Sequence, residues 1–198
     1  MADVFDCANF FIEIANSNED FDMTNMKLNK LLYYAQGAYL ARYGKALFSE
    51  TIQAWQHGPV VPKVYFKYNH CEGNPISEVD SNYTAEAFSG DELMTLVDVM
   101  REYGKYTAST LRNLTHEAGT PWTSVYVDGK KETISKSILK QYFTKHPVNS
   151  FKISGKIPVT RKLPKELYDS EEDAVWESYR KIGTLHPVDI IGIQNRLW

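Results

Sequence analysis

A zinc-protease motif is the first chemistry that the histidines of this sequence suggest. His116-Glu117 begins like the helical motif in which two histidines, one turn apart, hold the metal while the glutamate acts as general base. The position that would carry the second histidine is Thr120. We therefore expect no metal here and interpret His116 as a polar or capping residue.

The cysteines suggest a second chemistry, a thiol activated by a base. His70 and Cys71 could form such a pair, but adjacent residues rarely point at each other, and a catalytic histidine is usually distant in sequence. We expect His70 to stabilise a helix C-terminus and Cys7, on an apolar face, to be a buried small hydrophobe. Two cysteines so far apart provide neither a disulfide framework nor a zinc site on their own.

Other catalytic and cofactor-binding motifs are missing from the sequence. It contains no glycine-rich phosphate loop, no nucleophile elbow and no dinucleotide-binding fingerprint. We therefore expect a protein that is not an enzyme and needs no cofactor and no metal.

The composition is that of a folded protein of nearly neutral charge. The 198 residues are 43% hydrophobic and include 9 Phe, 13 Tyr and 4 Trp, with a net charge of −3. The longest uncharged run, residues 51–62, has 12 residues, whereas a membrane-spanning helix needs about 20 apolar ones. The first residues also lack the basic start of a signal peptide. These features predict a cytoplasmic protein without a membrane partner.

Charge is segregated along the chain. Residues 127–165 carry ten bases against two acids, whereas residues 1–22 carry six acids and no base. This separation of charge gives the protein an electric dipole, which can steer a charged partner during association. A nucleic acid is a less favoured partner, and its binding would weaken steeply with salt.

Helical periodicity dominates the first three quarters of the chain. Apolar spacing and capping residues predict helices over 4–15, from 24 or 25 to beyond 39, and over 62–69, 89–103, 107–117, 135–145 and 170–182. Short strands at 46–48 and 51–55 are expected to form one hairpin. Gly37 lies within the second helix, which predicts the close approach of another backbone.

The pattern predicts a mainly α protein: a compact multi-helix domain with one small β-hairpin, plus a C-terminal α/β appendage. We assign residues 1–147 to the helical domain and residues 148–198 to an extension packed on it.

Two stretches carry a recognisable family pattern. The first is Met26-Lys27-Leu28-Asn29-Lys30-Leu31-Leu32-Tyr33-Tyr34-Ala35-Gln36, continued by Ala54-Trp55-Gln56-His57-Gly58-Pro59-Val60 and Tyr65. The second is Leu111-x-x-Leu114-Thr115-His116-Glu117, followed by Pro121-Trp122. Together they resemble the SocA-like antitoxin domain, or Panacea domain, a family first described as phage-associated.

The resemblance implies an antitoxin of a toxin–antitoxin system that neutralises a neighbour-encoded toxin by direct binding. Two alternatives stay open: an adaptor that delivers the toxin to a ClpXP-type protease, and an enzyme that reverses the toxin's effect. The resemblance covers about residues 4 to 145, and its motif residues are expected to be mainly scaffold: Lys30, Leu31, Tyr33, Tyr34, Trp55, His57, Gly58, Pro59, Tyr65, Thr115, His116, Pro121 and Trp122.

Physical chemistry adds expectations for these motif residues. Gly58-Pro59 should form a tight turn. The indole N–H groups of Trp55 and Trp122 need partners if buried, and His57 and His116 are the nearest candidates if the two motifs meet. Of Tyr33 and Tyr34, one should face the core and the other its rim.

Specificity for one toxin should lie outside a motif shared by a family with varied toxins. We expect it in the basic stretch and apolar end of the extension, and the alternative is that this end completes the protein's own core. The candidate toxin-binding residues are Lys152, Lys156, Arg161, Lys162, Ile190, Ile193, Leu197 and Trp198.

Overall fold

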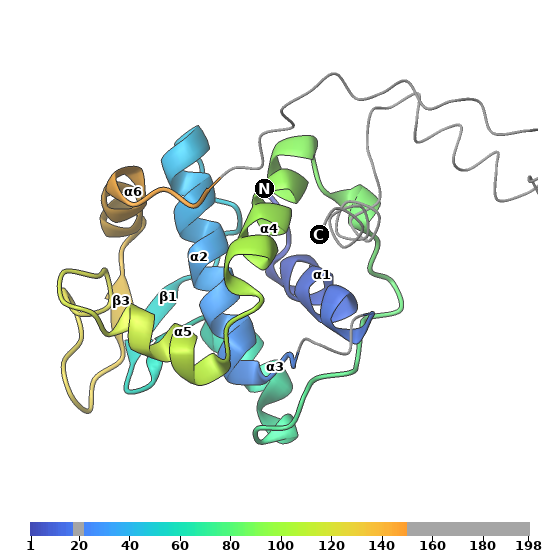
Figure 1. Cartoon of the computed structure of the whole chain (residues 1–198), viewed down its shortest axis with the longest axis horizontal. Helices are drawn as coiled ribbons and strands as arrows, with labels where there is room; N and C mark the ends of the chain where they lie inside the picture. Colours follow the sequence, from blue (N-terminus) through green and yellow to red (C-terminus); the bar gives the residue numbers. More distant parts are fainter. Residues whose placement is uncertain (18–21, 150–198) are drawn as a thin grey trace, which may run out of the picture. The chain divides into compact units, whose positions relative to one another are not determined.

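A computed structural model describes residues 1–17 and 22–149. This part of the chain contains six α-helices and a three-stranded antiparallel sheet, which confirms the predicted mainly α fold with a small β element (Figure 1). The helices are α1 (Val4–Asn16), α2 (Asn25–Tyr43), α3 (Pro62–Tyr68), α4 (Gly90–Tyr103), α5 (Ala108–Thr115) and α6 (Lys136–Lys145). The strands are β1 (Ile52–Trp55), β2 (Gly58–Val60) and β3 (Glu132–Ile134), and single 3-10 turns occur at Asn69–Cys71 and Ala85–Ala87.

The helix α2 is the centre of the fold. It packs against the other five helices and against β2, and Figure 1 shows it running between them. From Asn25 to Leu40 every residue except Met26 is buried. The sequence predicted an apolar stripe on one face, but the surrounding elements cover all faces, including those that carry Asn29, Lys30 and Gln36.

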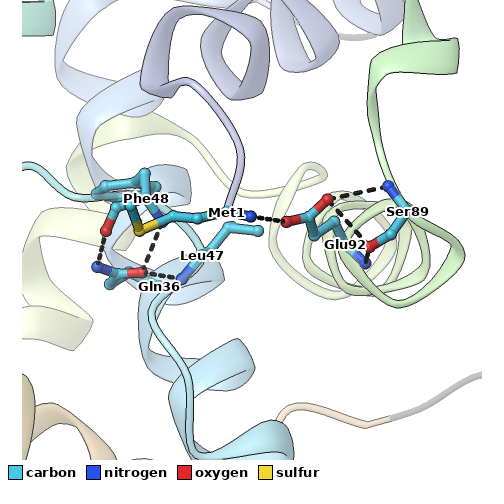
Figure 2. Close-up of polar contacts among 6 residues, drawn as sticks. All are labelled: Met1, Gln36, Leu47, Phe48, Ser89 and Glu92. Carbon is cyan, nitrogen blue, oxygen red and sulfur yellow. Dashed lines mark hydrogen bonds and ion pairs between the residues drawn. The ribbon is translucent and has the colours of Figure 1, made fainter.

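The polar residues of α2 are buried because they bind the backbone of the surrounding loops. The Gln36 amide donates to the Phe48 carbonyl at 2.9 Å, and its oxygen accepts from the Leu47 and Phe48 amides at 2.8 and 3.3 Å (Figure 2). The Asn29 oxygen accepts from the Val61 amide at 2.8 Å. Each bond satisfies a backbone group that burial would otherwise leave unpaired.

The prediction of a strand at 46–48 is wrong, because Gln36 binds the backbone of this segment. Leu47 and Phe48 use their backbone groups on Gln36 rather than on a neighbouring strand. The hairpin instead joins β1 to β2, with Trp55 opposite Gly58 and Gln56-His57 at the turn. The third strand, β3, pairs with the other edge of β1 and was not predicted, since two of its three residues are exposed and polar.

Helix ends follow the capping residues that the sequence offered. Thr24 caps α2, and Ser89 and Glu92 form a complete capping box at α4. Glu92 also lies 3.1 Å from the Met1 α-amino group (Figure 2). These residues satisfy free N–H groups at the helix starts, which is why the predicted helix boundaries were accurate.

The compact unit that contains the six helices extends to Asn149, the last described residue. Val148 is buried, and its carbonyl accepts from Arg42 at 3.0 Å, while the Asn149 carbonyl accepts from Arg101 at 2.8 Å. These contacts lie just beyond residue 147, the expected domain end. Residues 150–198, with the expected helix at 170–182 and most of the proposed extension, lie outside the described residues.

Close packing of α2 against α6 gives a first prediction. A Cβ at Gly37 would lie 2.1 Å from two atoms of the Phe143 ring. The group that packs closely against Gly37 is therefore a side chain, whereas the sequence predicted a backbone segment. We expect Gly37→Ala to lower the free energy of unfolding by about 1–3 kcal/mol, as overpacking does. Chemical denaturation measures this, with Gly90→Ala as control because a Cβ at Gly90 would meet nothing within 4 Å. A Gly37→Ala protein as stable as the parent contradicts this packing.

Candidate functional site

The two motif segments meet where the β1–β2 turn contacts the end of α5. The Trp122 indole donates to the Trp55 carbonyl at 2.8 Å, and His116 Nε2 lies 3.2 Å from the Gln56 carbonyl. The His116 and Trp122 rings are themselves 3.8 Å apart. Residues some 60 positions apart in sequence thus form one structural unit.

Histidines are not the partners of the two indoles, contrary to our expectation. Trp122 uses a backbone carbonyl, and the Trp55 indole donates to the Gln53 side chain at 2.9 Å. His116 instead presents Nδ1 to the Arg112 carbonyl at 2.7 Å and Nε2 to that of Gln56. A neutral imidazole can donate to one of these carbonyls, whereas an imidazolium donates to both.

Gly58 and Pro59 do not form the expected turn: they begin β2, directly after the turn at Gln56-His57, and Gly58 lies against Lys30. Gly58 has φ +102°, and a Cβ there would lie 2.6 Å from Lys30 Cε and 2.8 Å from Thr115 Oγ1. Lys30 Nζ donates to the Pro59 carbonyl at 3.1 Å. Only glycine allows both this backbone conformation and this approach to the lysine.

The Lys30 ammonium is an unusual group in this setting. Its residue is 1% exposed, and within the described part of the chain no carboxylate lies at ion-pair distance from it. Burial, and secondarily the positive charge of Arg112, lower the pKa of Lys30 to about 7. An amine with this pKa is about half charged near neutral pH.

A cavity of about 750 Å³ opens beside Lys30, between the start of α2, the β1–β2 turn and the loop before β3. Such a volume is typical of ligand-binding sites. Lys30, Trp55, His57 and Tyr65 are motif residues among its lining. The other lining residues are Thr24, Asn25, Met26, Asn29, Gln56, Val60, Asn69, Glu72, Gly73, Ala108, Tyr126, Asp128, Gly129, Lys130 and Lys131.

Aromatic and apolar side chains lie around this cavity. Trp55 contacts Tyr65 and Phe66, with ring centroids 4.8 and 6.1 Å away, and Lys131 Nζ lies 4.1 Å from the centre of the Trp55 ring. Phe66 is 58% exposed. We call Trp55, Tyr65 and Phe66 the aromatic rim.

The remaining motif residues belong to the core. Leu31 and Pro121 are buried. Tyr33 and Tyr34 are 1% and 6% exposed, so the prediction that one would lie at the rim is wrong. The reason is α6 and α4: Phe143 packs 5.5 Å from Tyr33, and Tyr103 stacks 3.8 Å from Tyr34.

The cysteines show one confirmed and one corrected expectation. Cys7 is fully buried, as predicted. Cys71 Sγ lies 3.5 Å from His70 Nε2, so these neighbours do approach each other, because a 3-10 turn carries them. His70 also contacts the Lys67 carbonyl at 3.1 Å near the end of α3, in agreement with the helix-end role.

Residues 1–17 and 22–149 lack two structural features, a cluster that could hold a metal ion and a helix that could cross a membrane. In that part, no three His, Cys, Asp or Glu residues cluster in a way that could hold a metal ion. Thr120, at the missing histidine position, donates to the Thr115 carbonyl. No described helix has both the length and the apolarity to cross a membrane.

The predicted toxin-binding residues lie outside the described residues: Lys152, Lys156, Arg161, Lys162, Ile190, Ile193, Leu197 and Trp198. The cavity and the aromatic rim were both missed by sequence reasoning. Their signal was present in Lys30, Trp55 and Tyr65, which we interpreted mainly as scaffold residues.

The buried ammonium predicts how stability depends on pH. Folding lowers the pKa of Lys30 from 10.5 to about 7, so the unfolded chain binds more protons between these values. The unfolding free energy should therefore rise with pH from about 7, by at most about 1.4 kcal/mol per unit. Denaturation of the parent and Lys30→Met at pH 6, 7, 8 and 9 isolates this contribution, since the variant lacks it. Parallel profiles for the two proteins contradict the depressed pKa.

Comparison with known proteins gives the family. Residues 28–123 match the family model described as "Antitoxin SocA-like, Panacea domain". Antitoxin SocA of Caulobacter vibrioides (strain NA1000 / CB15N) is 28% identical over 114 residues, which cover 52% of this chain and 60% of that protein's length. No solved structure matches the chain significantly. The matched region contains Lys30, the β1–β2 hairpin, α5 and Trp122, and residues 28–123 form a Panacea domain of the SocA-like antitoxin family.

Proposed function

We propose that this protein is an antitoxin that neutralises a neighbour-encoded toxin by binding it directly, and that the aromatic rim is part of the binding surface. The family membership supports the antitoxin role. The observation that carries direct binding is the concentration of exposed apolar side chains around the cavity.

This concentration is visible in the large hydrophobic residues that folding leaves exposed. Five such residues occur in the described part of the chain. Met26 lines the cavity, Phe66 belongs to the aromatic rim, and Val127 lies between two lining residues, Tyr126 and Asp128. Exposed apolar surface of this kind, with Trp and Tyr at its centre, is typical of protein–protein contact sites.

The motif residues have two roles in this proposal. His116, Trp122 and Thr115 fix the β1–β2 turn against α5, which holds Trp55 in place. Trp55 and Tyr65 then offer their exposed edges to the toxin. The candidate residues between 152 and 198 stay in the proposal as a second contact that distinguishes one toxin from another.

Neutralisation by binding predicts a fixed stoichiometry. Co-expression should rescue growth only when the antitoxin reaches about one copy per toxin, and the two proteins should co-elute in gel filtration. Protection should also persist in a host that lacks ClpXP. Rescue by trace amounts without a complex supports an enzyme instead, and loss of rescue in the protease-deficient host supports an adaptor.

The aromatic rim predicts which substitution separates binding from folding. Phe66→Ser should weaken the toxin complex at least tenfold while changing the melting temperature little, because the side chain is mostly exposed. Tyr43→Ser is the matched control, since Tyr43 is 37% exposed at the opposite end of α2. Calorimetric titration of both variants with the toxin measures the difference. Equal affinities for the parent and Phe66→Ser exclude this surface.

A further inference from the structure

We infer that the cavity beside Lys30 receives a carboxylate of the toxin, from an acidic side chain or the chain end, and that the Lys30 ammonium is its binding partner. This inference rests on the proposed function and deepens it by naming the group that the cavity recognises.

The first observation is the unused bonding capacity of Lys30. An ammonium has three N–H donors, and the structure gives Nζ one acceptor, the Pro59 carbonyl at 3.1 Å. Lys30 lines the cavity. A carboxylate entering there would supply the charge-assisted hydrogen bonds that the protein itself does not provide.

The second observation is a local excess of positive charge next to Lys30. Arg112 lies close enough to lower the pKa of Lys30, and its Nε is buried without a hydrogen-bond partner among the described residues. Within those residues neither cation forms a salt bridge. Charging Lys30 beside Arg112 with no counter-charge costs free energy, which an incoming anion would recover.

The neighbouring polar groups are already used and do not compete for the ligand. The Asn29 oxygen accepts from Val61, and the Asn25 amide donates to the Tyr65 carbonyl at 3.0 Å. Thr115 Oγ1, beside Gly58, donates to the Arg112 carbonyl at 2.7 Å. Lys30 therefore keeps donor capacity that Asn25, Asn29 and Thr115 have already used.

The cavity entrance favours a protein carboxylate over a polyanion. The exposed acids Glu72 and Asp128 line the cavity together with Lys130 and Lys131, so the entrance carries both signs of charge. The Tyr126 hydroxyl donates to Asp128, and Lys131 covers the Trp55 ring. Such an entrance offers a chain of phosphates no continuous positive surface, whereas one acid carried on an apolar segment can pass between the charges. The titratable and charged groups around Lys30 are Arg112, His57, Glu72, Asp128, Lys130 and Lys131.

The test measures proton uptake when the full chain binds the toxin. Titration calorimetry at pH 8 in HEPES and in Tris gives the number of protons taken up, because the two buffers differ in ionisation enthalpy. A carboxylate at Lys30 favours the charged ammonium, so the parent should take up nearly one proton more than Lys30→Met. The variant should also bind at least tenfold more weakly, whereas Lys130→Met, at the entrance, should retain the parent's proton uptake.

The outcomes separate this inference from the proposed function. Equal affinity and equal proton uptake for the parent and Lys30→Met overturn the inference while leaving direct binding intact. Failure of the parent to bind the toxin at all overturns both. Sodium acetate, compared with chloride at equal ionic strength, serves as the free carboxylate: it should weaken the parent's complex and leave that of Lys30→Met unchanged. If acetate shifts the lysine NMR signals of Lys30 but toxin affinity is independent of Lys30, the cavity takes a free carboxylate and the toxin assignment is wrong.

Discussion

The fold depends on the complete burial of one helix that carries polar side chains. An apolar helix could be buried by packing alone, but α2 also brings an asparagine, a lysine and a glutamine into the interior. Each must find a partner there, since an unpaired buried polar group costs about 1–3 kcal/mol. The partners are backbone groups of the loop at 47–48, of the β1–β2 hairpin and of the residue that precedes α3. The helix therefore determines where those segments lie, in addition to providing the core.

The same constraint explains the geometry of the site. Lys30 is held by the Pro59 carbonyl, and Pro59 is held by the β1–β2 turn, which His116 and Trp122 fasten to the end of α5. This chain of contacts places a desolvated amine in the wall of a cavity that Trp55 and Tyr65 also line. A partly apolar surface whose backbone is already held by such contacts loses little conformational entropy when a partner binds.

Burial of Lys30 carries a stability cost that a purely structural residue would not need. A methionine of similar length would fill the same space without the desolvation of an amine. Retention of a costly polar group beside a cavity is characteristic of functional sites, where stability is exchanged for binding or chemistry. The Panacea pattern therefore combines scaffold residues, such as Tyr33 and Trp122, with residues that reach the surface, such as Trp55.

The sequence by itself determined the helices, their caps and the family. Helical periodicity and capping depend on residues three or four positions apart, so Thr24, Ser89 and Ser135 marked helix starts that the structure confirms. Burial of Cys7 followed from the same local pattern.

Only the tertiary structure decided which groups satisfy each other and where a cavity remains. Gln36 replaced a predicted strand pairing with side-chain hydrogen bonds, Phe143 made Gly37 necessary, and α4 and α6 buried both tyrosines of the motif. The physical reason is that these contacts join segments far apart in the chain, whereas periodicity reports only on neighbours. The isolation of the Lys30 charge from any carboxylate of the described residues is likewise a property of three-dimensional packing, which residue spacing cannot encode.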